Sequence, residues 1–242
     1  MSIQGIYIAP KASQAMQSLE QAILLTNRGI DGDRYCTHQG TYSVLRGSQK
    51  QTGKEREPGR HLTIMSQDSI LEAFARSNLQ PPADLGDLRR NVVVQGISSQ
   101  DLLSAIGHVI ELGNDGVKVL VQRHSVPCMY NERKNKIKGM MEAIWMEAGV
   151  CCQILQGGSI AKGDSITILP YDDAFKSMLD PGSHSPGFII PPSRRTKEMV
   201  FATIQAKKKQ KELLMQLDPE GVKITQESYA SVGLQMWPET KN

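Results

Sequence analysis

The stretch His61-Leu62-Thr63-Ile64-Met65, followed by Ser66, sets a pattern that recurs through most of the chain. Its apolar and β-branched residues predict a short strand. Ser66 is suited to cap a helix that continues to about Asn78, because its side chain can accept from the first free backbone N–H groups. The predicted apolar face of that helix consists of Ile70, Leu71 and Phe74.

Similar apolar runs, each bounded by turn residues, occur on both sides of this unit. They cover residues 3–8, 22–25, 91–94, 108–112, 117–121, 150–155 and 166–169. The predicted strands are short and closely spaced, and they do not alternate regularly with helices. We therefore predict a mixed β-barrel with a few helices rather than a parallel α/β sheet.

Two further helices and two loops complete this region. Ser98 or Ser99 can cap a short helix that reaches residue 103. A single lysine-rich helix is expected over residues 131–147, with its apolar stripe formed by Ile137, Met140, Met141, Ile144 and Trp145. Residues 157–164 are expected to form a turn, and residues 40–59 a long surface loop.

The composition changes after residue 170, which predicts a division of the chain. Residues 1–170 are assigned to the barrel, and residues 171–242 to an arm and a helix that pack on the barrel or extend from it. Residues 180–193 are rich in Pro, Gly and Ser, as extended arms are. Residues 194–217 predict a helix, and we interpret its lysines as a solvated face rather than a nucleic-acid contact.

Length, charge and cysteine count limit the classes of protein. The chain has 242 residues and 39% hydrophobic content, enough for one sizeable core. Its net charge of +3 comes from 28 basic and 25 acidic residues, so any anion site must be local. No apolar stretch approaches the ~20 residues that cross a bilayer. The N-terminus lacks signal-peptide features. With few cysteines, these observations predict a cytoplasmic protein.

Cys128 is the cysteine most suited to chemistry. It ends the basic, proline-bounded segment Arg123-His124-Ser125-Val126-Pro127-Cys128. Cationic neighbours favour the thiolate, which is the form that binds metals and carries sulfur. Cys151 and Cys152 lie in an apolar run and are expected to behave as small hydrophobic residues.

Several familiar site patterns are missing from the sequence. Residues 47–55 resemble a phosphate-binding loop, but the spacing is one residue too long and Glu55 replaces the expected Ser or Thr. The spacing Cys36-Thr37-His38 has no second pair of ligands, which argues against a structural zinc site. Neither an H-E-x-x-H nor a G-x-S-x-G motif is present.

Basic residues instead recur at turns that lead into the predicted strands. They are Arg34, Arg60, Arg90 and Arg123. Guanidinium groups bind phosphate in a bidentate manner, and backbone N–H groups at glycine turns can bind anions. Together these positions predict a site for one phosphate-bearing ligand beside the Cys128 thiolate. Asn91 and Asp33 are further candidates, although Asp33 and Asp164 can equally fix turns through their own backbone contacts.

The order of these segments resembles the MOSC domain, which is found at the C-terminus of molybdenum cofactor sulfurases and in stand-alone proteins of the YiiM type. The resemblance covers most of the chain from Ile3 to Pro170. It is carried by the segments 29–34, 60–64, 88–96, 127–128, 149–150 and 157–166 in this order. Each segment is common alone, whereas the ordered set with one Pro-Cys is specific.

The resemblance implies a β-barrel that holds a molybdenum cofactor of the molybdopterin type. In family enzymes the cysteine that matches Cys128 binds molybdenum, and N-hydroxylated small molecules are reduced. In other members the same cysteine has been proposed to carry sulfur as a persulfide, so a non-catalytic sulfur or cofactor carrier is the alternative. Both uses suit a soft thiolate. Arg60, Arg90 and Arg123, with Arg34 and Asn91, are the implied cofactor-binding residues.

The implied partners follow from what the chain lacks. It has no Cys cluster for an iron–sulfur centre, so a reductase would need an external electron-donor protein, and a carrier would need a sulfur donor. A membrane role is not expected. A third interpretation is a nucleic-acid or protein-interaction module that binds through the lysines of the predicted helix over residues 194–217. Binding to nucleic acid would then weaken as the salt concentration rises.

Overall fold

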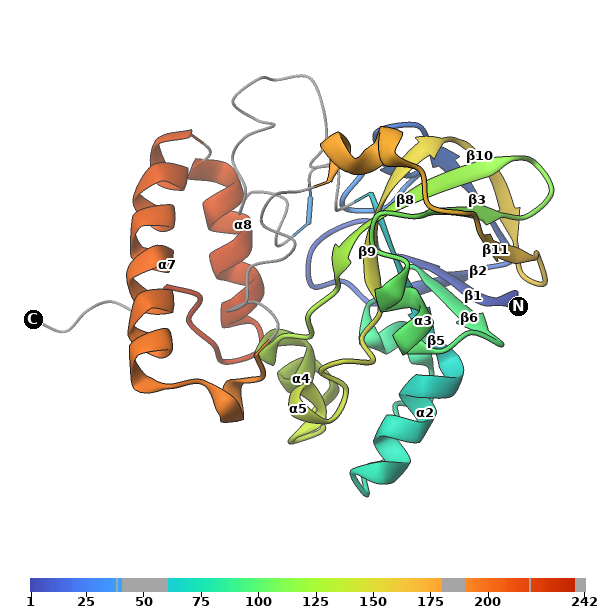
Figure 1. The fold of residues 1–242 in the computed structure, drawn as a ribbon. Coiled ribbons are helices and arrows are strands. Elements are labelled where there is room, and N and C mark those ends of the chain that lie inside the picture. The colour runs from blue at the N-terminus through green and yellow to red at the C-terminus, as the bar shows by residue number, and fades with distance from the viewer. Residues whose placement is uncertain (38, 41–60, 180–189, 218, 238–242) are drawn as a thin grey trace, which may run out of the picture.

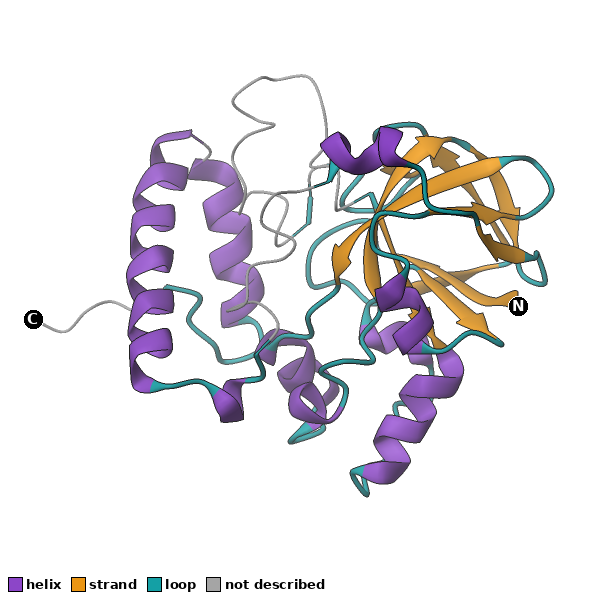
Figure 2. Cartoon of the chain, in the orientation of Figure 1, coloured by secondary structure: helices purple, strands orange, loops and turns teal. Residues whose placement is uncertain are grey.

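The structure is a computed structural model that describes residues 1–37, 39–40, 61–179, 190–217 and 219–237. Its centre is a sheet of eight strands. The sheet is curled and has helices around it, as Figures 1 and 2 show. The order of the strands across the sheet is β11-β7-β8-β9-β5-β6-β1-β2. The prediction of a mixed, barrel-like β-fold with a few helices is confirmed.

The strands of the large sheet are mostly antiparallel. In chain order they are β1 (Ser2–Ile8), β2 (Gln17–Leu19), β5 (Leu62–Ser66), β6 (Val92–Gln95), β7 (Val109–Leu112), β8 (Val117–His124), β9 (Val150–Gln156) and β11 (Ile166–Ile168). The exception is β5, which runs parallel to β6 with Ile64 opposite Val92. Parallel neighbours need a long connection, and α2 (Gln67–Arg76) and the 3-10 helix η2 (Leu85–Leu88) provide it.

Backbone hydrogen bonds join the two ends of the curled sheet. The Ile3 N–H donates to the Asp164 carbonyl over 2.9 Å, and the Gly163 N–H donates to the Ile3 carbonyl over 2.8 Å. Ser2 also forms an isolated antiparallel bridge with Ser165. The first residues of β1 therefore contact the strand at the opposite end of the sheet, which gives the sheet its barrel character.

The unit that opened the sequence analysis forms largely as predicted. Ser66 caps α2 by accepting from the Ser69 N–H. Ile70 and Phe74 are buried, but Leu71 is 41% exposed, so its assignment to the apolar face is wrong. Ser98 caps α3 (Ser99–Ser104) with a capping box that includes Asp101.

Two local predictions are corrected. Residues 157–164 contain strand β10 (Gly158–Ala161), which pairs with β3 (Gln21–Leu25) in a small sheet with β4 (Gly29–Ile30). The single helix expected over residues 131–147 is two helices, α4 (Met129–Asn135) and α5 (Met140–Ala143). The break lies where Lys136 and Gly139 adopt left-handed backbone conformations.

Apolar side chains form three clusters. The largest fills the inside of the curled sheet, with residues such as Ile6, Ile64 and Val119. A second packs α2 and α5 against the sheet around Phe74 and Met140. The third joins residues next to Cys128 to the C-terminal helices.

The C-terminal part begins with the 3-10 helices η3 (Asp173–Met178) and η5 (Pro192–Arg194). Two longer helices follow, α7 (Lys197–Leu217) and α8 (Pro219–Ala230), with α8 between α7 and the barrel (Figure 1). The predicted helix is confirmed, while α8 was not predicted. In the part of the chain described, no helix combines the length and apolar character needed to cross a membrane.

Gly149, immediately before β9, and Gly163 provide a matched pair of substitutions that tests how closely the backbone packs around Gly149. Both have a positive φ, of 84° and 89°. A Cβ on Gly149 would lie 2.0 Å from the Ile64 carbonyl oxygen, whereas a Cβ on Gly163 would meet nothing within 4 Å. We expect Gly163→Ala to cost about 1–2 kcal/mol of unfolding free energy through its backbone conformation. Gly149→Ala should cost about 2 kcal/mol more, because the backbone must move. Chemical denaturation measures both, and equal losses would contradict the packing.

Candidate functional site

Cys128 lies at the junction between the barrel and the helices. It precedes α4, and its carbonyl accepts from the backbone N–H groups of Asn131 and Glu132. The Cys128 side chain makes no capping hydrogen bond to the helix. It is partly exposed, while Cys36, Cys151 and Cys152 are buried. The sulfur of Cys128 is thus the thiol in the described chain that is best placed to meet a ligand.

Arg90 holds the segment that carries Cys128. Its Nε donates to the Ala148 carbonyl over 2.6 Å, and its Nη2 donates to the Ser125 carbonyl over 3.0 Å. The Ser125 N–H in turn donates to the Gly149 carbonyl over 2.8 Å. Arg90 therefore fixes the turn three residues before Cys128 against the loop that enters β9.

The Arg90 guanidinium also lies within electrostatic reach of the site. Burial lowers the pKa of Arg90, whereas Cys151, Cys128 and Tyr35 favour its charged form. Arg34 is close enough to oppose that charge. Arg90 is thus a cationic side chain within electrostatic reach of Cys128.

Arg89 is a second cation at this place; it lies within the segment 88–96, but the sequence patterns assigned it no role. It is 8% exposed and adopts a left-handed conformation, with φ of 62°, at the end of η2. Its Nη1 donates to the Gln14 carbonyl over 2.7 Å, and its guanidinium lies 5.9 Å from the centre of the Tyr130 ring. Burial and then Arg34 lower the pKa of Arg89. The buried guanidinium groups of Arg34 and Arg89 thus repel each other.

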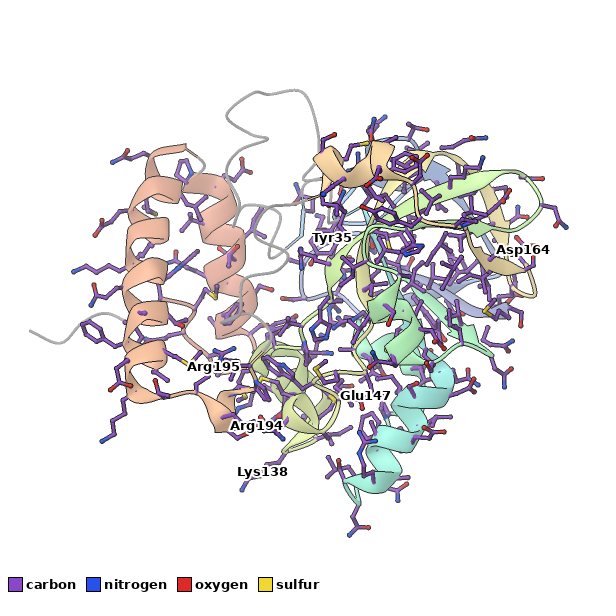
Figure 3. All side chains as sticks on the ribbon, in the orientation of Figure 1. Tyr35, Lys138, Glu147, Asp164, Arg194 and Arg195 are labelled. Carbon is purple, nitrogen blue, oxygen red and sulfur yellow. The ribbon has the colours of Figure 1, made fainter. Side chains whose placement is uncertain are left out.

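Arg34 forms an ion pair with Asp33. Among the described residues, this is the one ion pair that involves Arg34, Arg89 or Arg90. Arg34 Nη1 lies 3.2 Å from Asp33 Oδ1, and both side chains are buried. Asp33 also accepts from the backbone N–H groups of Ala9 and Tyr35, so it fixes the turn as well as the pair. Tyr35, over whose ring Arg34 stacks at 4.7 Å, lies on the side of the barrel that faces α8 (Figure 3).

The charge around Cys128 is therefore strongly one-sided. In the described part of the chain, neither Arg89 nor Arg90 has a carboxylate partner, and their hydrogen bonds go to backbone carbonyls. We call Arg34, Arg89 and Arg90 the arginine cluster; Asp33 is the carboxylate paired within it. Buried charges are normally paired, so this cluster is suited to an anion.

Arg123 and His124 end β8 next to this cluster. Both are buried, at 4% exposure each. Arg123 Nη1 donates to the His124 carbonyl over 3.3 Å. Burial, together with the charges of Arg90 and Arg123, lowers the pKa of His124 to about 4. His124 is thus neutral at pH 7 and does not add the positive charge that the sequence suggested for a basic segment.

The remaining residues predicted for the site either have structural hydrogen bonds or lie outside the described residues. Asn91 is buried, and its amide bridges three strands by accepting from Thr63 and donating to the Tyr7 carbonyl. Asp164 accepts from the Ala161 N–H and fixes a turn. Arg60 lies outside the described residues, as do residues 47–55 and His38. Among the residues described, no group of His, Cys, Asp and Glu side chains could hold a metal ion.

The C-terminal helices cover the site on one side. Cys128 packs against a cluster that consists of Tyr130, Leu214, Val222, Tyr229, Met236 and Trp237. The Tyr130 and Tyr229 rings lie 5.7 Å apart, and the hydroxyls of Ser13 and Ser228 are 2.6 Å apart. Upstream of α7, Arg195 lies over the Trp145 ring at 5.6 Å, beside α4 and α5 (Figure 3). The prediction that the C-terminal helix packs on the barrel or extends from it did not identify these contacts, because most of the residues that form them lie about a hundred positions from Cys128.

The structure predicts selective modification of Cys128 in the native protein. With iodoacetamide at neutral pH, we expect Cys128 to react at least about tenfold faster than the other cysteines, because buried thiols are inert until the chain opens. Burial also raises the pKa of Cys152. Peptide mass spectrometry measures each rate, and Cys128→Ser should remove the fast phase. Equally fast labelling of Cys36 or Cys151 would contradict the described burial.

Comparison with known proteins agrees with the fold. The YuaD protein from Bacillus subtilis has 21% identity and a TM-score of 0.54, covering 71% of this chain and 96% of that chain. YiiM from Geobacillus stearothermophilus has 12% identity and a TM-score of 0.50, covering 89% and 98%. Among curated proteins, no match was found. A family model described as the MOSC domain matches residues 49–167. Residues 49–167 thus match the MOSC domain that the ordered motifs predicted.

Proposed function

We propose that this protein binds a molybdenum cofactor of the molybdopterin type and reduces N-hydroxylated small molecules, with Cys128 as the protein ligand to molybdenum. The MOSC family is associated with binding of this cofactor. The observation that carries the proposal is the arginine cluster next to a partly exposed thiol. A phosphate-bearing group with a soft metal requires these two features together.

The residues present fit such a cofactor. Among the described residues, the printed hydrogen bonds of the Arg89 and Arg90 guanidiniums go to backbone carbonyls and none goes to a carboxylate, so a phosphate group would be their anionic partner. Arg34 lies next to both and would add a third guanidinium, while Asp33 orients it. Arg123 borders the cluster on the β8 side. Arg60 and Asn91 stay predicted contributors.

Cys128 would supply the metal ligand. Its sulfur is not used as a helix cap, and Cys128 is among the groups that favour the charged form of Arg90. Bound molybdenum would supply two-electron chemistry, in which the N–O bond of the substrate is broken and an amine and water are formed with two protons. The protein would orient the substrate between Cys128 and the cover formed by Tyr229, Met236 and Trp237.

Electrons for this reaction would come from an external donor protein. Among the described residues, no Cys-rich group could hold an iron–sulfur centre. The alternative function is a carrier that holds sulfur on Cys128 and passes it on. The packing of Cys128 against the C-terminal cluster favours the reductase, because a carrier must present its sulfur to another protein.

Metal and pterin contents test the proposal. In protein purified from a cofactor-producing host, we expect stoichiometric molybdenum and pterin, with molybdenum lost by at least about tenfold in Cys128→Ser. Arg89→Gln should lower pterin retention by about tenfold or more, since a charge-assisted hydrogen bond contributes about 1.5–3 kcal/mol. Arg133→Gln, at an exposed position on α4, is the matched control and should retain both.

Activity separates the two functions. The wild-type protein should reduce a hydroxylamine test compound with a chemical electron donor, and Cys128→Ser should not. Sulfane sulfur on Cys128 without metal would support the carrier and refute the reductase. A folded protein with neither molybdenum nor sulfane sulfur would refute both.

A further inference from the structure

His124 is the buried titratable side chain next to the arginine cluster whose role is still unassigned. It ends β8, is 4% exposed, and lies close to both Arg90 and Arg123. Neither ring nitrogen is in hydrogen-bond geometry with a described group, although a backbone group of Trp145 lies near the ring. A buried donor left without a partner costs about 1–3 kcal/mol, so an unpaired ring needs an explanation.

The surroundings of the ring explain why it stays neutral. The charged groups that act on it are the guanidiniums of Arg90, from the turn before β6, and Arg123, from its own strand. A backbone group at Trp145 acts in the opposite direction, more strongly than Arg123 does but less than burial and Arg90. On the neighbouring strand β9, His124 faces the uncharged Val150. Protonation would place a third positive charge among these groups in a buried site.

An anion held by Arg90 and Arg123 would reverse this balance. A dianion would cancel the repulsion from both guanidiniums and would also offer an acceptor to the ring. Protonation of His124 would then be favoured by the same ligand that the arginines bind. Binding of the anion and binding of the proton become linked.

We propose that His124 belongs to the anion-binding site, where it donates a ring N–H to a bound dianion and takes up a proton as the anion binds. This inference rests on the proposed function in one respect, since it requires an anion in the arginine cluster. It adds a residue of this chain to that site and a dependence of binding on pH.

The sign of the pH dependence follows from the linkage. In the free protein the pKa of His124 is about 4, and the bound anion raises it. Affinity should therefore fall as pH rises from about 4 toward the pKa of the bound state, by up to about tenfold per pH unit, and should then level off. Removal of the ionisable ring should abolish this dependence.

Sulfate is a suitable probe because it stays a dianion over the whole range. Calorimetric titration of the full chain, prepared from a host that lacks the pterin cofactor, would be run from pH 5 to 7 in two buffers of different ionisation enthalpy. Wild-type protein should take up a proton with each sulfate, and His124→Gln should bind with no proton uptake. His108→Gln is the matched control, because His108 contacts the Leu169 carbonyl at another place and should behave as wild type.

The outcomes separate this inference from the proposed function. Sulfate binding that Arg89→Gln weakens, without proton uptake in the wild type, would refute the role of His124 and leave the anion site intact. No sulfate binding would refute the inference, while the molybdenum and pterin contents would still decide the proposed function. If His124→Gln does not fold, the ring ¹⁵N signals of His124 in the wild-type protein at pH 6 decide. They should change from neutral to imidazolium on addition of sulfate, and unchanged signals would overturn the inference.

Discussion

An excess of positive charge next to Cys128, with Asp33 as the carboxylate paired to Arg34, is the constraint on which the site depends. Arg89 and Arg90 are consecutive in the sequence; Arg89 has a left-handed backbone and is buried, whereas Arg90 is partly buried and bonded to carbonyls around the site. Their hydrogen bonds go to backbone carbonyls, which orient them without neutralising them. Buried charge of this kind lowers stability unless an anion is bound, so the fold maintains a site at an energetic cost.

The barrel makes this arrangement rigid. Arg90 connects the turn before β6 to the Ser125 carbonyl and to the loop before β9, and Ser125 is itself bonded to Gly149. Asn91, the next residue, bridges β1, β5 and β6 through its side chain. The contacts of Asn91 with β1 and β5 therefore hold the neighbouring Arg90, and Arg90 holds the segment that leads to Cys128. The C-terminal helices close the opposite side through Tyr229 and Trp237.

Sequence patterns predicted the parts of the fold that depend on local chemistry. The strand ending near Met65, the Ser66 and Ser98 caps and the apolar run at residues 150–155 depend on nearest neighbours, and all formed. The helix over residues 131–147 was wrong because its periodicity hid the left-handed residues Lys136 and Gly139. Strand β10 was missed because its pairing with β3 comes from far away in the sequence. In the site, Arg34, Arg90 and Cys128 do come together, whereas the burial of Arg89 and the neutrality of His124 come from packing that no motif encodes.

A crystal structure of the protein isolated with its cofactor, with molybdenum located by anomalous scattering, tests this account most directly. The account predicts molybdenum on the Cys128 sulfur and the cofactor phosphate within hydrogen-bonding distance of the Arg89 or Arg90 guanidinium. Molybdenum bound away from Cys128, or a phosphate with no guanidinium contact, would contradict it.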